Sequence, residues 1–141
     1  MTNEEKQLIL TKDICGRAAY WFDLKVDYNG KAYTPFGFGA GRLSLLESPF
    51  MSYTTGYSPL IEEVKPYLRP MSSMTEEEKK EFDKVLKSCN DKVFACPDKE
   101  RRYNFFDAEQ EDFMNAHYFD YRGLIPMGLA LEALEDMYKT K

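Results

Sequence analysis

Apolar and polar residues alternate over residues 20–28, and this is the most regular pattern in the chain. The apolar positions are Tyr20, Phe22, Leu24, Val26 and Tyr28. A period of two is typical of a β-strand that buries one face. Asn29 and Gly30 then favour the positive φ angles of a type I′ turn, after which the chain can return as a partner strand. The pattern therefore predicts a β-hairpin at about residues 19–34.

The first residues of the chain carry the signals of a helix. Thr2 can cap the helix N-terminus and Glu5 can return the hydrogen bond, which together make a capping box. Apolar residues behind this box recur every four positions, at Leu10, Ile14 and Ala18. We predict a helix at about residues 3–15 that Gly16 ends in a left-handed conformation.

Two further helices are predicted in the second half of the chain. Thr75 to Glu78 form another capping box, with acidic residues in the first turn, where the helix dipole favours anions. This helix is expected to run to about Ser88. Asp107 can cap a third helix that runs from Ala108 to about Tyr118.

Shorter strands are expected between and around these helices. Residues 35–59 are rich in Gly, Pro and Ser and are expected to form a loop, interrupted by a strand at 42–46. Further strands are predicted at 92–96 and 101–106. Residues 129–138 fit a strand or a helix equally well, because they alternate in part and also contain strong helix formers.

This order of elements indicates an α+β protein. A length of 141 residues predicts one domain that spans residues 1–141. We expect an antiparallel sheet, including the hairpin at about residues 19–34, that is packed by two or three helices. Aromatic residues make up 15% of the chain, and each can bury about 150–250 Å², so we expect a core built on Phe and Tyr.

The net charge of −5 argues against a nonspecific nucleic-acid binder, which needs a clustered cationic surface. The segment DKERRYNFF (98–106) leaves a local contact open, because Arg101 and Arg102 adjoin aromatic residues that can stack on bases. A strand with a charged edge explains the same residues. Nucleic acid is therefore the less favoured partner.

The cysteines do not form a recognisable metal or disulfide pattern. Cys15, Cys89 and Cys96 contain no CxxC pair, and together with His117 they do not match the spacing of zinc sites. We expect free thiols and neither a metal nor another cofactor. The opening MTNEEKQLIL lacks a basic region followed by an apolar one, and no apolar run approaches the ~20 residues of a membrane span, so we expect a cytoplasmic protein.

The stretch AHYFDYRGLIP (116–126) contains the only histidine and the strongest candidate for chemistry. A histidine can act as a general base when a carboxylate orients it, and Asp120 and Arg122 follow His117 closely. Such a site would need a nucleophile from elsewhere, for example Ser72, Ser73 or Cys15. A turn that leads into the following glycine explains the same residues, and we favour this structural interpretation over catalysis.

Arginines and tyrosines supply the candidates for ligand binding, because both residue types are enriched at recognition surfaces. The glycine-rich stretch FGFGAG (36–41) precedes Arg42 as in phosphate-binding loops, but its spacing matches neither GxGxxG nor GxxxxGK[ST], which favours a mobile loop. The candidate ligand-binding residues are Arg42, Tyr67, Arg69, Tyr121 and Arg122.

Two segments resemble a widespread family of small uncharacterised proteins of gut Bacteroides and their phages. They are VKPYLRPMSSMTEEE (64–78) and DFMNAHYFDYRGLIPMGLALEA (112–133), and the opening EEKQLILTKDICGRAAY is also similar to that family. Members typically carry Trp at the position of Phe113 and a second His at the position of Tyr118. The resemblance implies a setting in phage or mobile elements and brings no known activity.

These observations favour a non-catalytic cytoplasmic binding module, such as a phage or mobile-element accessory protein. Its partner would be a host protein or a small nucleotide ligand, and a homo-oligomer is left open. The alternative is a small hydrolase or nucleotide-processing enzyme that uses His117, Asp120 and Arg122. An enzyme is the less favoured of the two interpretations.

Overall fold

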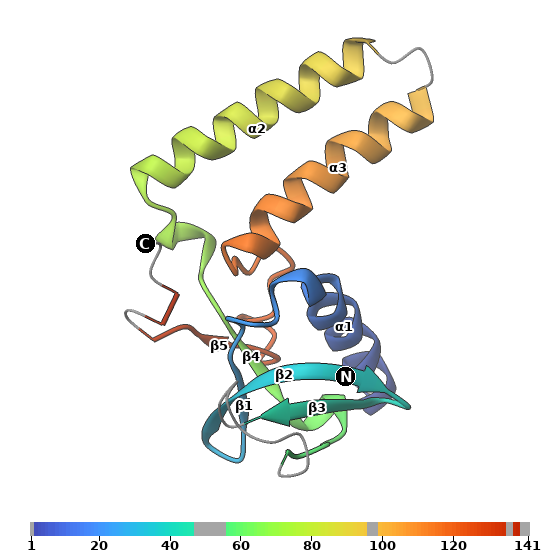
Figure 1. Cartoon of the computed structure of the whole chain (residues 1–141), viewed down its shortest axis with the longest axis vertical. Coiled ribbons are helices and arrows are strands. Elements are labelled where there is room, and N and C mark those ends of the chain that lie inside the picture. Colours follow the sequence, from blue (N-terminus) through green and yellow to red (C-terminus); the bar gives the residue numbers. More distant parts are fainter. Residues whose placement is uncertain (1, 47–55, 96–98, 135–136, 139–141) are drawn as a thin grey trace.

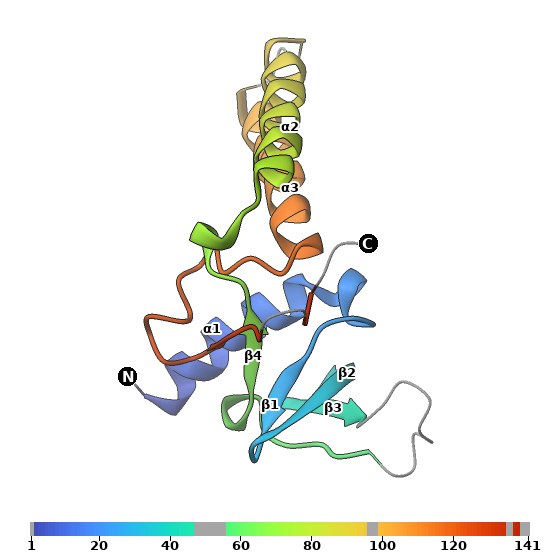
Figure 2. The same ribbon diagram turned by 90° about the vertical axis from the view of Figure 1, so that its left-hand side faces the viewer.

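The computed structural model describes residues 2–46, 56–95, 99–134 and 137–138, and the side chains of these residues apart from 88–107. Its five-stranded sheet and three α-helices make a small α+β domain, as predicted. The helix α1 (Asn3–Gly16) packs beside the sheet, whereas α2 (Glu76–Ala95) and α3 (Lys99–Ala116) form a helical hairpin. Figures 1 and 2 show that this hairpin projects away from the body formed by the sheet and α1.

The predicted hairpin is present. Strand β1 (Val26–Tyr28) pairs with β2 (Lys31–Gly39) in an antiparallel register that places Val26 opposite Tyr33. The turn between them has φ angles of 53° at Asn29 and 83° at Gly30, as a type I′ turn requires. The local turn chemistry was sufficient to predict this connection.

The first strand begins later than the alternation predicted. Residues Ala18–Tyr20 form a short 3₁₀ helix, η1, in place of extended chain. The indole N–H of Trp21 donates a 2.7 Å hydrogen bond to the carbonyl of Ile14, which folds this segment back onto the end of α1. The prediction that Gly16 ends α1 in a left-handed conformation was also wrong, because the chain continues through Arg17 at φ −97° directly into η1.

The glycine-rich stretch forms a second hairpin in place of the expected mobile loop. Strand β2 continues to Gly39 and turns through Ala40 and Gly41, with φ angles of 53° and 74°, into β3 (Arg42–Leu46). Gly39 lies opposite Arg42 across this turn. Positive φ angles at two successive residues make this a tight hairpin turn and not a phosphate-binding loop. The strand predicted at residues 42–46 is confirmed.

The sheet is mixed, whereas the sequence suggested an antiparallel one. Its strand order is β3-β2-β1-β4-β5, where β4 spans Lys65–Leu68 and β5 spans Leu131–Glu132. Strand β1 pairs with β4 antiparallel, but β4 and β5 are parallel. Parallel neighbours need a long crossover connection, and the α2–α3 hairpin provides it.

The strands predicted at 92–96 and 101–106 were wrong, because α2 continues to Ala95 and α3 begins at Lys99. Residue 96 lies outside the described residues. Asp107, predicted as a helix cap, lies inside α3. Each helix covers the other along the hairpin, and this tertiary contact outweighs the weak local preference for strand.

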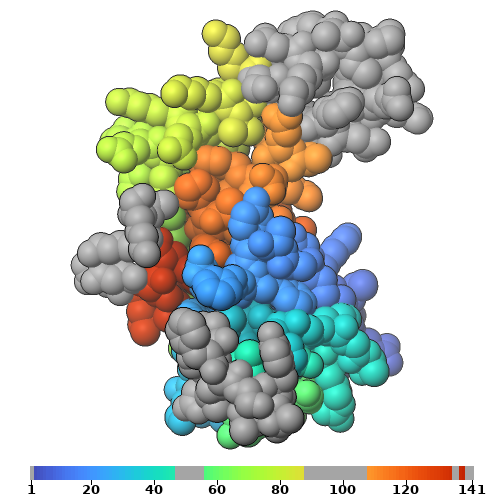
Figure 3. Space-filling model, in the orientation of Figure 1, coloured from blue at the N-terminus to red at the C-terminus, as the bar shows by residue number. Residues whose placement is uncertain are grey.

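The core consists of two clusters. The larger one lies between α1 and the sheet and is mainly aliphatic, although we expected a core built on Phe and Tyr; its fully buried members are Leu10, Ile14, Leu24, Val26, Leu43, Leu45, Ile61, Val64, Leu68 and Leu124. The smaller cluster is centred on Phe113, Met114 and Phe119 at the base of the hairpin. In the space-filling view, the surface of α3 lies between those of α2 and α1 (Figure 3). Among the described residues, no helix is long and apolar enough to span a membrane.

The first turn makes a direct prediction about stability. Gly30→Val should lower the free energy of unfolding by about 1–2 kcal/mol, because a β-branched residue resists the φ angle of 83°. Ala32→Val is the matched control, since this exposed position lies in extended β2. Urea denaturation of the two variants measures the difference. Equal midpoints for Gly30→Val and wild type would contradict the turn assignment.

Candidate functional site

The end of α3 positions the only histidine. Tyr118 follows the helix with a φ angle of 59°, and its amide and that of Phe119 donate to the carbonyls of Asn115 and Met114. These two bonds make a Schellman motif, which usually has glycine at the left-handed position. Here a tyrosine occupies that position. Tyr118 is buried, its ring centroid lies 4.2 Å from that of Tyr138, on which it stacks, and its hydroxyl donates a hydrogen bond to the carbonyl of Tyr20.

His117 packs between aromatic rings and faces a carboxylate of α2. Its ring centroid lies 4.5 Å from that of Phe113 and 6.2 Å from that of Phe119. Its Nδ1 atom is 3.1 Å from Oε2 of Glu78, while Nε2 is 3.8 Å from Oε2 of the more exposed Glu81. A carboxylate that contacts one ring nitrogen fixes the orientation of an imidazole, as in many acid–base and metal sites.

Glu78 is held by several donors at once. It is the acidic partner of the predicted capping box, because its amide donates to Oγ1 of Thr75 and its Oε1 accepts from the amide of Thr75. Arg69, which directly follows β4, donates two further hydrogen bonds of 2.7 Å, one to each carboxylate oxygen of Glu78. The hydrogen bond from Arg69 is the main reason that the pKa of this carboxyl is lowered to about 2.

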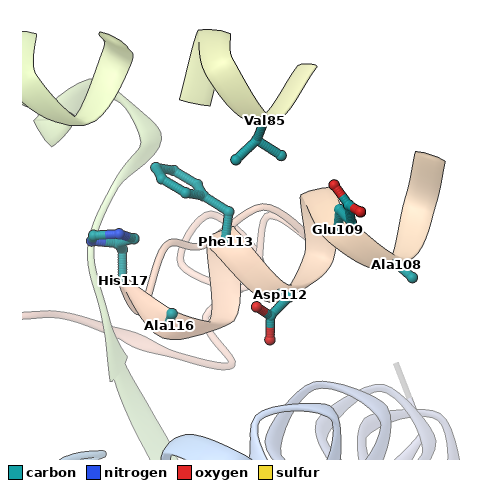
Figure 4. A pocket seen from close by; sticks show the side chains of 7 residues that line it. All are labelled: Val85, Ala108, Glu109, Asp112, Phe113, Ala116 and His117. Carbon is teal, nitrogen blue, oxygen red and sulfur yellow. The ribbon is translucent and has the colours of Figure 1, made fainter. Parts of the chain in front are cut away.

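A cavity of about 460 Å³ adjoins His117 between α2 and α3 (Figure 4). Its described lining residues are Val85, Ala108, Glu109, Asp112, Phe113, Ala116 and His117. Val85 comes from α2, while the others belong to α3 and the residue that follows it. The volume lies within the ~300–1,000 Å³ that is usual for small-molecule sites.

Asp112 connects the rim of this cavity to the body of the protein. The hydroxyl of Tyr20 in η1 donates a 2.5 Å hydrogen bond to Oδ1 of Asp112. This bond is the main reason that the pKa of Tyr20 is raised to about 12, because it favours the protonated hydroxyl. Tyr20 therefore anchors one carboxylate of the lining in a defined position.

The structure separates the three residues that the sequence grouped as catalytic candidates. Asp120 turns away from His117 and accepts hydrogen bonds from the amides of Leu124 and Ile125, at 2.7 and 2.9 Å. Arg122 forms a 2.8 Å ion pair with Asp13 of α1. His117 therefore contacts Glu78 and not Asp120.

A buried ion pair in α1 was not recognised from the sequence. Asp13 and Arg17 are both fully buried and form a salt bridge of 3.0 Å, and Arg17 also donates to the carbonyl of Phe119 at 2.7 Å. The i, i+4 spacing of an aspartate and an arginine was the available signal. Because such spacing usually occurs on exposed helix faces, the sequence alone does not indicate burial.

The candidate ligand-binding residues are spread over the molecule. Arg42 donates to the carbonyl of Ser58 at 2.9 Å, and Arg69 is committed to Glu78. Tyr67 is partly buried in β4, and burial raises the pKa of its hydroxyl. The ring of Tyr121 lies beneath the guanidinium groups of Arg17 and Arg122, at 5.3 and 4.5 Å, so none of these five candidates lines the cavity.

The described part of the chain has no group of three or more His, Cys, Asp or Glu side chains placed to hold a metal ion. Cys15 is a free thiol whose pKa is raised by burial, whereas the side chains of Cys89 and Cys96 lie outside the described residues. The chain matches none of the family models, curated proteins or solved structures with which it was compared. The functional interpretation therefore depends on the geometry of the site.

The ion pair of Glu78 predicts a specific dependence of stability on pH. Its pKa falls from an ordinary 4.5 to about 2 on folding, so ionised Glu78 stabilises the folded state above about pH 4.5. This contribution, roughly 3 kcal/mol, should be lost as the pH falls from 4.5 towards 2. Urea denaturation over this range should show a shallower loss of stability for Glu78→Gln than for wild type.

The exposed Glu76 supplies the matched control, because it lies in the same helical turn. Glu76→Gln should leave the pH dependence close to that of wild type. Parallel pH curves for wild type and Glu78→Gln would show that the ion pair contributes no net stability.

The turn that follows α3 predicts a loss of stability for Asp120→Asn. The asparagine side chain keeps one acceptor but places an amide donor against the N–H of Leu124 or Ile125, which costs about 1–3 kcal/mol. The exposed Asp83→Asn changes the same charge on α2 and should leave the denaturation midpoint nearly unchanged. Wild-type stability for Asp120→Asn would mean that the carboxylate serves something other than the turn.

Proposed function

We propose that the protein is a small-ligand binding module whose site is the cavity between α2 and α3. The observation that carries this proposal is the composition of the lining, in which the apolar side chains of Val85 and Phe113 lie near the polar groups of Glu109 and His117, while Asp112 lies on the α1 side of α3 (Figure 4). Ligand sites commonly combine apolar walls with a few fixed polar groups. Both helices that form the cavity are attached to the body through Arg69–Glu78 and Tyr20–Asp112.

Binding is supported over catalysis by the chemistry of the lining. Its described residues include no serine, threonine, cysteine or lysine, so they offer no hydroxyl, thiol or amine nucleophile for His117 to activate. The three residues of the hydrolase alternative also lie apart, because Asp120 caps a turn and Arg122 pairs with Asp13. The one observation in favour of an enzyme is the contact between His117 and Glu78, which resembles an oriented base.

The resemblance to proteins of gut Bacteroides and their phages supports an accessory role in a phage or mobile element. In such a role the protein would act in the cytoplasm and remove or sense a small molecule of the host. A partner protein is the second candidate and would contact the same face of the helical hairpin. The cavity supports the small ligand more directly, because its volume and lining suit a small molecule.

A fragment screen that is read by NMR tests the proposed site. His117 is the only histidine, so its ring protons give one set of signals directly at the cavity. Fragments that bind there should shift these signals saturably. Ala108→Trp should abolish the shifts, because its indole ring fills the exposed edge of the cavity. Lys84→Trp introduces the same side chain on α2 at a position that does not line the cavity, so it should preserve the shifts. The proposal fails if no fragment shifts the signals, or if Ala108→Trp binds as wild type does.

A further inference from the structure

We propose that the outer face of α1 is a dimerisation surface, on which a second copy of this chain packs its own α1 in the antiparallel orientation. The surface consists of Glu4, Leu8 and Lys12, together with the neighbouring side chain of Phe38. The inference goes beyond the proposed function, because none of these residues lines the cavity between α2 and α3. Three features support it: an exposed leucine, the groove beside this leucine, and the charges on either side of it.

The first feature is an apolar side chain on the solvent-facing side of α1. The helix buries Leu10, Asp13 and Ile14 on its inner side. Leu8 is two positions from Leu10, which places it roughly 200° around the helix from that buried residue. Its side chain is 69% exposed, so its apolar surface is available to another molecule.

The second feature is a groove beside Leu8. It has a volume of about 320 Å³ and lies between α1 and the turn that joins β2 to β3 (Figure 1). Its described lining residues are Glu4, Gln7, Leu8, Thr11, Phe38 and Gly41. Phe38 is 37% exposed, so two large apolar side chains from different elements border the same groove. A single exposed apolar residue is ordinary on a protein surface, whereas neighbouring ones beside a groove are typical of an interaction site.

The third feature is the pair of charges on either side of Leu8. Glu4 precedes it by four residues and Lys12 follows it by four, so the three side chains form one stripe along the helix. Both charged residues are exposed, and neither forms an ion pair within the described part of the chain. The helix dipole favours the same order of charges, but it does not account for the exposed leucine between them. A partner that covers Leu8 accounts for all three residues.

The stripe is complementary to itself. When two copies of α1 cross in opposite directions at Leu8, the two leucines meet on the two-fold axis, and Glu4 of each copy lies opposite Lys12 of the other. Helices pack about 8–10 Å apart, a distance that a glutamate and a lysine can span together. A parallel arrangement would instead place like charges opposite each other, and like charges repel. The charge pattern therefore selects a second copy in the antiparallel orientation.

The exposed leucine provides the first test. One pair of helices makes a small interface, so we expect a weak dimer whose population rises with protein concentration in sedimentation equilibrium. Leu8→Gln should raise the dissociation constant by about tenfold or more, because an amide replaces the central apolar contact while helix propensity is retained. Leu134→Gln makes the same change at another exposed leucine, outside the stripe, and should leave the dissociation constant unchanged.

Charge reversal tests the orientation. Glu4→Lys and Lys12→Glu each replace two attractive contacts by two repulsive ones, so each variant alone should dimerise about tenfold more weakly than wild type. An equimolar mixture of the two variants should associate with nearly wild-type affinity, because every lysine of the stripe in one variant then faces a glutamate in the other. Glu77→Lys is the matched control, since Glu77 is exposed and is the second residue of α2, as Glu4 is of α1. It should leave self-association unchanged.

Three results would overturn the proposal. The first is a wild-type chain that stays monomeric up to its solubility limit. The second is equal weakening by Leu8→Gln and Leu134→Gln, and the third is a mixture of the two charge variants that associates no better than each variant alone. Far-UV circular dichroism and urea denaturation of every variant establish that a loss of association is not a loss of fold, which we expect because all the substituted side chains are exposed.

Discussion

The ion pair between Arg69 and Glu78 joins the end of β4 to the start of α2, and it also holds the carboxylate that His117, far along the chain, contacts. Arg69 follows β4, Glu78 lies in the first turn of α2, and His117 at the end of α3 contacts the same carboxylate. Because Glu78 is almost fully buried, its charge must be matched by donors, and Arg69 and Thr75 supply them. These contacts connect the end of β4 to the start of α2 and orient the imidazole beside the cavity.

A second constraint acts where α3 ends. Tyr118 adopts a left-handed conformation that costs a non-glycine residue about 1–2 kcal/mol, and its burial and its stacking on Tyr138 offset this cost. The chain can then turn back beside Arg69, whose amide bonds to the carbonyl of Tyr118. The buried Arg17 reinforces the turn by donating to the carbonyl of Phe119, so α1 also supports the end of α3.

The cavity lies beside these constraints. One side is limited by His117, which Glu78 orients, and another by Asp112, which Tyr20 anchors to the body. Both side chains are therefore held in position by other residues of the protein, and the arginines that the sequence suggested as ligand-binding residues are occupied elsewhere. Arg69 and Arg122, for example, each pair with a carboxylate of the protein.

The sequence by itself determined the features that depend on neighbouring residues. The capping boxes at Thr2 and Thr75 and the turn at Asn29 are all present, because a few adjacent dihedral angles and hydrogen bonds specify them. Residues 92–96 and 101–106 were predicted as strands, but residues 92–95 and 101–106 are helical, since the packing of one helix on another is a contact between distant segments. The partner of His117 was also decided only in three dimensions. The less favoured catalytic interpretation paired His117 with Asp120, three residues away. In the structure Asp120 bonds to the backbone of the turn, as the favoured interpretation expected, and Glu78, far away in the sequence, lies against the ring.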